Sequence, residues 1–323
     1  MLRIVLNRFG MLFFLLCGSG AVVGATDAEQ AAFAKRTASK YKLDEAWINK
    51  TLAAAEFQQA VRDAYKRTAE SKPWSEYRPI FVTAKRAKAG RKFMAQHAQA
   101  LARAEQEYGV PASVITAIIG VETFYGTYTG KYRVLDSLVS LAFYDWKRRK
   151  FFTRELQEFL ALSAEGNVDP LTIKGSYAGA MGLPQFIASS YRAYSVDFDG
   201  DGKRNLLTSP VDAIGSVAAY LSRHGWQRGG AITERIVSPT RFPEAEYKRN
   251  KKPKVKLSSL RARGFREFPK LDPATPLMIV NLRGAQGGER WAVLNNFYVI
   301  TRYNHSPLYA MAVTQLAQLL EPK

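Results

Sequence analysis

Apolar residues recur at helical spacing over much of the chain, and this pattern predicts a mainly α-helical fold. Alanine-rich stretches of residues 27–110 alternate apolar and charged positions, which predicts a helical lobe over residues 26–110. The segment Pro73 to Pro79 interrupts the pattern, so we predict a loop there that holds Tyr77 in a rigid setting. Further helical patterns cover residues 134–166, 211–224 and 308–320.

A short apolar segment near the middle of the chain predicts a buried helix. Pro111 opens it, as is common in the first turn of a helix, and Val114 to Val121 is apolar on nearly every side. Glu122 follows directly. Burial and the C-terminal end of a helix both disfavour a charged carboxylate, so both raise its pKa. A carboxyl group that stays protonated can donate a proton to a glycosidic oxygen. The alternative, a capping or salt-bridged glutamate, is favoured by this segment alone.

The last third of the chain changes character. Residues 227–297 contain more proline and β-branched residues, with a basic stretch from Lys248 to Lys256, which predicts a small β-rich lobe. Ser306-Pro307 starts a final helix, so we predict that residues 298–323 return to the helical part. The predicted fold class is α+β, predominantly α, with a central core over residues 111–226.

The first residues resemble an export signal. Arg3 and Arg8 precede an apolar run, which leads to the small residues Val23-Gly24-Ala25. We predict a signal peptide over residues 1–25, cleaved after Ala25, and a periplasmic protein. Cys17 is the single cysteine and is a candidate lipoprotein anchor. Leu16 stands before it where a small residue is wanted, so an outer-membrane lipoprotein is the less favoured alternative.

The charge narrows the class of partner. The formal net charge is +19 and the isoelectric point is about 9.9, which favours an anionic polymer. Nucleic acid, acidic lipid and cell-wall glycopeptide all fit that description. The export signal and the lack of any nucleic-acid motif argue against nucleic acid.

Several motifs occur together in one order. A Glu-Thr pair at Glu122 is followed by a Gly-Ala-Met-Gly-x-x-Gln-Phe loop that ends at Phe186. This joint pattern resembles the lytic murein transglycosylases, and their B type most closely. The resemblance extends over most of the mature chain, through the segments Val211 to Tyr220, His224 to Trp226 and Thr301 to Ser306.

The resemblance implies a lysozyme-like catalytic core that cleaves peptidoglycan glycan strands. In this family one glutamate, here Glu122, serves as acid and then as base. The 6-hydroxyl of muramic acid attacks the anomeric carbon, and the product is a 1,6-anhydro sugar. Most glycosidases use two carboxylates. The motif segments of this chain contain no obvious second one, and neither Asp136 nor Asp145 lies in a motif that supports such a role.

The resemblance also assigns substrate contacts. Ser176 and Gln185 take positions near the N-acetyl group and the catalytic glutamate, and Phe151 stands about where the family has a cleft tyrosine. Aromatic faces suit sugar rings, although core packing is the ordinary role of a single tyrosine. Lys147 and Arg148 either bind stem-peptide carboxylates or form a solvated basic face. The remaining cleft positions are Tyr77, Tyr220, Tyr303, Asn304 and Tyr309.

A loop after residue 196 copies the first half of an EF-hand. Three carboxylates alternate along it and a glycine allows the sharp turn. Thr208 replaces the closing glutamate, and the resemblance implies that an aspartate four residues later closes the loop instead. We predict a structural calcium ion, with a simple Asp-Gly turn as the alternative. Its ligands would be Asp197, Asp199, Asp201, the Lys203 carbonyl and Asp212.

Two other functions remain open from sequence. A hydrolytic muramidase would use water in place of the substrate hydroxyl, and its product would be one water heavier. A non-catalytic wall-binding scaffold would not need a buried acid. We expect a monomer that binds peptidoglycan, with other cell-wall enzymes as possible partners.

Overall fold

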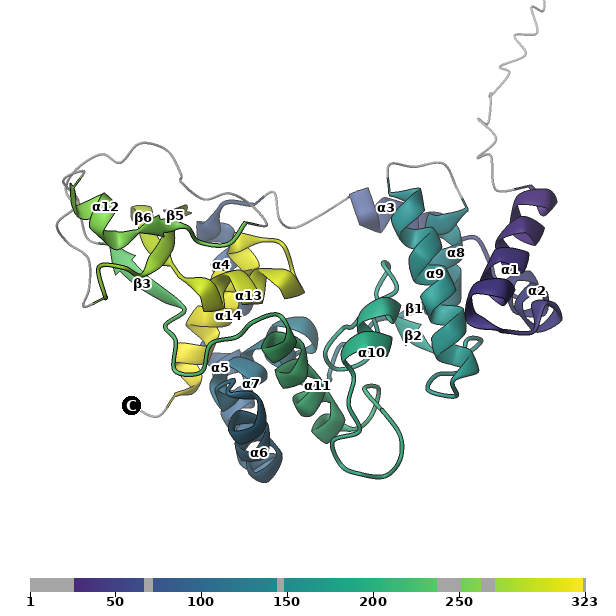
Figure 1. The fold of residues 1–323 in the computed structure, drawn as a ribbon, viewed down its shortest axis with the longest axis horizontal. Helices are drawn as coiled ribbons and strands as arrows, with labels where there is room; N and C mark the ends of the chain where they lie inside the picture. Colours follow the sequence, from purple (N-terminus) through teal and green to yellow (C-terminus); the bar gives the residue numbers. More distant parts are fainter. Residues whose placement is uncertain (1–25, 67–71, 144–147, 237–250, 263–270, 322–323) are drawn as a thin grey trace, which may run out of the picture.

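The computed structural model describes residues 26–66, 72–143, 148–236, 251–262 and 271–321. Most of these residues lie in helices, and the strands form a two-stranded and a four-stranded antiparallel sheet (Figure 1). The predicted fold class, α+β with helices predominating, is confirmed. The signal peptide and Cys17 lie outside the described residues.

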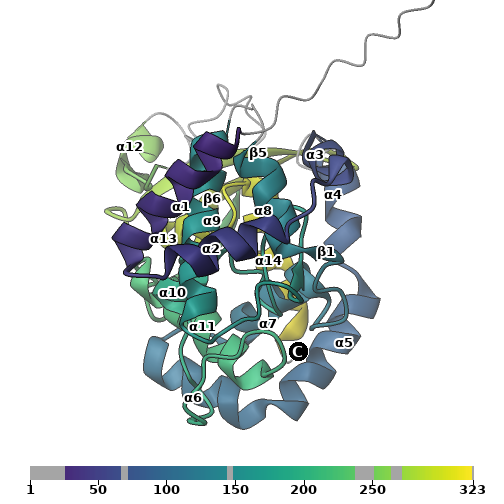
Figure 2. The ribbon, with the colours of Figure 1, turned by 90° about the vertical axis from the view of Figure 1, so that its right-hand side faces the viewer.

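One end of the molecule is built on helices α8 and α9. α8 and α9 pack against each other, and α1, α2, α3 and α10 lie around them (Figure 1). Figure 2, which views this end, shows α1 and α2 lying across its front. The bounds are α1 (Asp27–Tyr41), α2 (Glu45–Ala53), α3 (Gln59–Lys66), β1 (Tyr132–Arg133), α8 (Val134–Ala142), α9 (Arg149–Ala164), β2 (Lys174–Gly175) and α10 (Ala188–Tyr194).

The middle and the other end hold the remaining elements. Helix α7 contacts α5, α6, α11 and α14, and the four-stranded sheet contacts α4 (Figure 1). The bounds are α4 (Trp74–Phe81), α5 (Ala84–Gln96), α6 (Ala98–Tyr108), α7 (Ala112–Thr123), α11 (Pro210–Arg223), β3 (Thr233–Ile236), β4 (Val255–Lys256), α12 (Leu257–Ala262), β5 (Pro276–Gly284), β6 (Gly287–Val293), α13 (Asn295–Tyr303) and α14 (Pro307–Leu320).

The helices of residues 26–110 do not form one lobe, which corrects the sequence prediction. Tyr41 of α1 donates a 2.6 Å hydrogen bond to Glu158 of α9, and Gln157 of α9 donates to Thr37 of α1. In contrast, α5 packs on α7, and α6 packs on α7 and α11. Helical periodicity predicts that a segment buries one face, but it does not say which distant helix covers that face.

The predicted loop at Pro73 to Pro79 is also wrong, because α4 covers most of it. Pro73 takes the N-cap position, and its carbonyl accepts bonds from Glu76 and Tyr77. Pro79 lies in the last turn of this short helix, where its missing N–H removes only one bond.

The β-rich segment forms the four-stranded antiparallel sheet, in the order β3-β6-β5-β4. Alternate residues of a strand face opposite sides. Met278, Val280 and Leu282 of β5 therefore join the main core, whereas Leu277 and Ile279 pack with residues of α12 in a smaller cluster. The sheet thus has apolar partners on both faces.

Helix α7 is buried from Ser113 to Val121, as its sequence predicts. It ends in two consecutive left-handed residues, Phe124 (φ 50°) and Tyr125 (φ 60°). The Tyr125 ring packs between Gly120 of α7 and Gly90 of α5, where an added Cβ would lie within 2.6 Å of the tyrosine oxygen. The two glycines therefore let this ring fix the end of α7 against α5.

Candidate active site

Glu122 is the penultimate residue of α7, and its side chain is only partly exposed. Tyr309, a fully buried residue of α14, donates a hydrogen bond of 2.7 Å to Glu122 Oε1. The acid is therefore held at the junction of two buried helices that lie 187 residues apart in sequence.

Burial raises the pKa of Glu122 from 4.5 to about 7, because the charged form loses the stabilisation of water. The hydrogen bond from Tyr309 acts in the opposite direction, since it stabilises the carboxylate, but its effect is smaller. Near neutral pH the two protonation states are similarly populated. A group with this pKa can give a proton and later take one back.

Three of the predicted cleft tyrosines form one group of rings beside this acid. The rings of Tyr303 and Tyr309 stack with centroids 6.4 Å apart, and Tyr220 meets Tyr303 edge-on at 4.9 Å. Burial, followed by the charge of Glu122, holds the pKa of Tyr303 and Tyr309 well above the usual tyrosine range. These hydroxyls therefore stay neutral and act as hydrogen-bond groups.

Two of these hydroxyls donate to backbone carbonyl groups. Tyr303 Oη donates to the Pro184 carbonyl at 2.5 Å, and Tyr220 Oη donates to the Arg302 carbonyl at 2.6 Å. Each bond joins segments distant in sequence. The hydroxyls thus order the backbone around the acid.

The other cleft predictions concern Tyr77 and Asn304. Tyr77 is buried in α4, and it lies close enough to Tyr309 to raise the pKa of that tyrosine further. Asn304 Oδ1 accepts a bond from the Ser306 backbone, in the turn where Ser306 caps α14. Both residues therefore support the helix that carries Tyr309.

The glycine-rich loop presents Ser176 and Gln185. Ser176 Oγ accepts bonds from the backbone of Ala178 and Ala180, which holds the loop in a tight turn. Gln185 adopts a left-handed backbone (φ 50°), and its amide donates to the carbonyls of Thr129 and Gly182. The loop is thereby fastened to the turn that follows α7.

Thr123 is a site residue to which the sequence analysis gave no role. Its buried hydroxyl lies 2.9 Å from the Leu183 carbonyl and 3.2 Å from the Ile119 carbonyl, and it accepts a bond from the Gly126 backbone. It ties the end of α7 to the glycine-rich loop. Its place beside Glu122 in the shared motif was a signal that it takes part in the site.

Other buried acids are engaged in structural bonds. Asp136 pairs with Arg133 at 2.6 Å and accepts a bond from the Glu56 backbone. Glu155 accepts two bonds from Ser189 at the start of α10. Burial raises the pKa of Glu155, and the two bonds lower it. Neither carboxyl is available as the second catalytic acid, and Asp145 lies outside the described residues.

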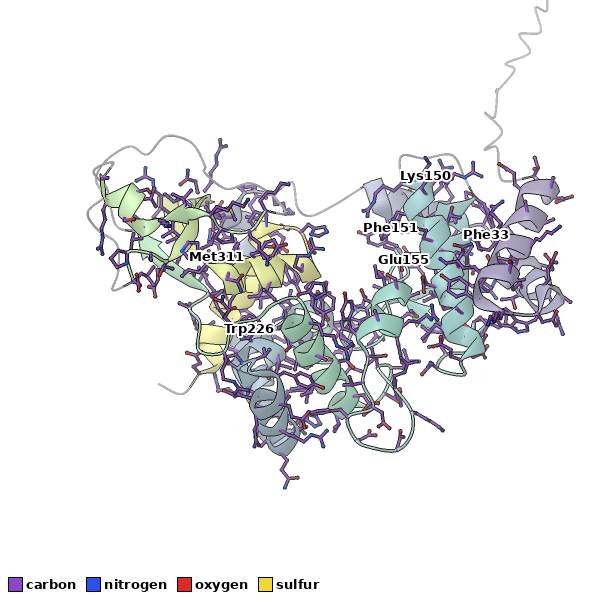
Figure 3. The ribbon with its side chains drawn as sticks, viewed as in Figure 1. Phe33, Lys150, Phe151, Glu155, Trp226 and Met311 are labelled. Atoms are coloured by element: carbon purple, nitrogen blue, oxygen red, sulfur yellow. The ribbon has the colours of Figure 1, made fainter. Side chains whose placement is uncertain are left out.

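The basic residues near residue 148 form a separate group. The Arg148 guanidinium lies 4.4 Å from the centre of the Phe151 ring, and Phe151 meets Phe152 edge-on. Figure 3 shows Phe151 on the part of the molecule built on α9, apart from Met311 of α14. Lys147 lies outside the described residues, so its role stays a prediction.

The acidic loop brings three carboxylates together. Carboxylate oxygens of Asp197, Asp199 and Asp201 lie within 4.8 Å of one another, and all three residues are exposed. Hard cations such as calcium prefer oxygen ligands of this kind. The donor set and its spacing therefore fit a calcium ion.

Asp212 does not join that cluster, which differs from its predicted position as a ligand. It is fully buried, and its carboxylate accepts backbone bonds from Phe198 (2.7 Å), Asp199 (3.2 Å) and Asn205 (2.7 Å). In this structure Asp212 supports the loop from the core side. Sequence spacing placed it near the loop but could not show that backbone N–H groups take up its oxygens.

An acid of raised pKa at the end of a buried helix is suited to donate a proton to a glycosidic oxygen. Comparison with known proteins agrees. The family model of the transglycosylase SLT domain matches residues 25–318. The membrane-bound lytic murein transglycosylase B of Escherichia coli K12 is 44% identical over 245 residues, which cover 76% of this chain and 66% of that protein.

Solved structures give the same result. The catenated lytic transglycosylase SltB1 of Pseudomonas aeruginosa is 46% identical with a TM-score of 0.85, covering 91% of this chain and 97% of that one. The lytic transglycosylase Slt35 of Escherichia coli, solved in complex with calcium, is 38% identical with a TM-score of 0.81, covering 94% and 97%. The chain therefore belongs to the transglycosylase SLT domain family, as the motifs predicted.

Whether a helix could span a membrane can be stated for the described residues. Among the described residues, no helix is both long enough and apolar enough to cross a bilayer.

The raised pKa of Glu122 predicts a pH-dependent cost to stability. Between pH 4.5 and about 7 the unfolded chain releases this proton while the folded chain keeps it, so the free energy of unfolding falls as pH rises. Glu122→Gln removes that cost. We expect the variant to melt at least about 2 °C above the wild type at pH 8.5, with the difference shrinking towards pH 4.5.

Thermal unfolding followed by circular dichroism at the two pH values measures this effect. Glu76→Gln is the matched control, because the Glu76 side chain is 60% exposed. An equal shift for both variants, or a shift that does not change with pH, would contradict the assignment.

Proposed function

We propose that this protein is a lytic transglycosylase that cleaves the β-1,4 bond between N-acetylmuramic acid and N-acetylglucosamine in peptidoglycan. The observation that carries the proposal is the pKa of about 7 for Glu122, the acid to which Tyr309 donates a hydrogen bond. Family membership supports the same class of substrate, since murein is peptidoglycan.

In the proposed reaction Glu122 acts twice. Its protonated carboxyl donates to the glycosidic oxygen as the bond to the anomeric carbon breaks. The resulting carboxylate then accepts the proton of the muramic acid 6-hydroxyl, and that oxygen bonds to the anomeric carbon. No water is consumed, and the released strand ends in 1,6-anhydromuramic acid.

The neighbouring residues would bind and orient the sugars. The ring faces of Tyr77, Tyr220, Tyr303 and Tyr309 suit the apolar faces of sugar rings. Ser176, Gln185 and Asn304 carry polar groups suited to the N-acetyl substituents. Arg148, with Lys147, would contact stem-peptide carboxylates.

The products of digestion test this proposal. Purified peptidoglycan should yield fragments with anhydro ends, each one water lighter than the fragment a hydrolytic muramidase releases. Glu122→Gln should reduce turnover by at least about a hundredfold, because the same group serves both steps, while the fold stays intact. Reducing ends in the products would favour the hydrolytic muramidase, and near-normal turnover by the variant would favour a different acid.

We also propose a structural calcium ion in the acidic loop. Its ligands would be the carboxylates of Asp197, Asp199 and Asp201 with the Lys203 carbonyl, and Asp212 would hold the loop beneath them. The related Slt35 was solved with calcium. The ion would offset the repulsion of three charges within five residues and is not needed for proton transfer.

Calcium should raise the melting temperature of the wild type, because an ion that binds only the folded loop stabilises it in proportion to the logarithm of its concentration. Asp199→Asn with Asp201→Asn should lose most of this response, whereas Asp27→Asn, an exposed aspartate outside the loop, should keep it. Calorimetry with calcium and with a chelator measures both. No shift at millimolar calcium would mean that the loop is only a turn.

The proposed site of action is the periplasm, reached through the signal at residues 1–25. The mature chain should start near Thr26 and carry no lipid, which N-terminal sequencing of exported protein checks. Fatty acid attached at Cys17 would show an outer-membrane lipoprotein instead. We expect the mature protein to act as a monomer.

A further inference from the structure

A groove of about 670 Å³ lies between α4, the end of α14 and the hairpin of β5 and β6. Its walls carry two tryptophans and two arginines, one of each from α4 and from the sheet. None of the residues that line it is among the predicted glycan contacts. Its principal side chains are Trp74, Arg78, Arg235, Glu289, Trp291 and Gln315.

The groove shares its helices with the catalytic site. Helix α4 carries Tyr77 as well as Arg78, and α14 carries Tyr309 as well as Gln315. Gln315 lies six positions after Tyr309, and a helix rises about 1.5 Å per residue, so the groove begins roughly 9 Å further along α14. The groove and the catalytic site are therefore less than two helical turns apart along α14.

The groove contains planar polar groups and charges of both signs. Arg78 Nε donates to Gln315 Oε1 at 2.6 Å, which uses one of the five N–H donors of the guanidinium. Trp291 donates to Glu289 at 3.3 Å. Among the described residues, the buried indole nitrogen of Trp74 has no hydrogen-bond partner. Guanidinium groups match carboxylates in a two-pronged geometry, and an exposed pair of arginines is not needed to bind a neutral sugar.

The wall of the groove opposite α4 leaves room for a peptide to approach. It is the turn between β5 and β6, where Gly284 pairs with Gly287. A Cβ added at Gly287 or Gly288 would meet no atom within 4 Å, so the space above the turn is open. A peptide backbone can therefore lie against the turn, with the side-chain amides of the groove as hydrogen-bond partners.

We propose that this groove binds the stem peptide of peptidoglycan while the glycan strand occupies the site at Glu122. The two arginines take the peptide carboxylates, Glu289 takes an ammonium group, and Trp291 covers the apolar part of the peptide. This inference rests on the proposed function, because it takes the substrate class from it. It adds a second contact region that selects strands still bearing peptides.

The test measures binding of a free stem tripeptide, L-alanyl-γ-D-glutamyl-diaminopimelate, to mature Glu122→Gln protein by calorimetry. Arg78→Gln with Arg235→Gln should weaken binding at least about tenfold, because each change removes a charged partner of a carboxylate. Arg283→Gln is the matched control, since it neutralises an exposed arginine of β5 that does not line the groove. Amidation of the peptide carboxylates should weaken binding of the parent protein to a similar extent.

Two further measurements locate the peptide. A saturating chitooligosaccharide should leave the tripeptide affinity unchanged, whereas competition would place the peptide in the catalytic site and overturn the proposal. Equal losses for Arg283→Gln and for the groove variant would also overturn it, as would absence of binding.

The proposed function is tested separately by wild-type cleavage of glycan strands stripped of peptide. If these strands yield anhydro ends and the tripeptide does not bind, the groove proposal alone fails. If the tripeptide binds in the groove and no glycan is cleaved, the proposed function alone fails.

Discussion

The burial of one carboxyl group is the constraint on which the site depends. Glu122 ends a helix whose preceding residues are buried on all sides, and the loss of water around its charge raises its pKa to about 7. A charged carboxylate would be more stable in an exposed position, so the fold must hold the acid where it is. The cost is met by packing along α7, which lies between α5, α6, α11 and α14.

The residues that contact the end of α7 fix the position of the acid. Tyr309 reaches it from the last helix, Thr123 fastens the same turn of α7 to the glycine-rich loop, and the Tyr125 ring fits between Gly90 and Gly120. Each contact joins the end of α7 to a different segment. The acid is thus positioned by parts of the chain that meet only when the whole core has formed, which links catalysis to folding.

Apolar periodicity in the sequence predicted the buried helix with a glutamate at its end, and the resemblance to the lytic transglycosylases assigned that glutamate the role of the acid. The sequence also predicted the acidic loop, since its ligand pattern is local. It could not show that α1 and α2 cover α9 rather than α5 and α6, because periodicity does not identify the partner of an apolar face. The loop predicted around Tyr77 is a helix, since proline is tolerated at both ends of so short an element. The groove could not be predicted from the sequence, because Arg78, Arg235 and Gln315 come together only through tertiary packing.

The most direct test of this account is the titration of the Glu122 side-chain carboxyl carbon by ¹³C NMR, with Glu122→Gln used to assign its signal. A midpoint near pH 7 is expected, because burial raises the pKa of this carboxyl from 4.5. A midpoint near 4.5 would mean that the carboxyl is charged at neutral pH and that burial does not prepare it to act as an acid.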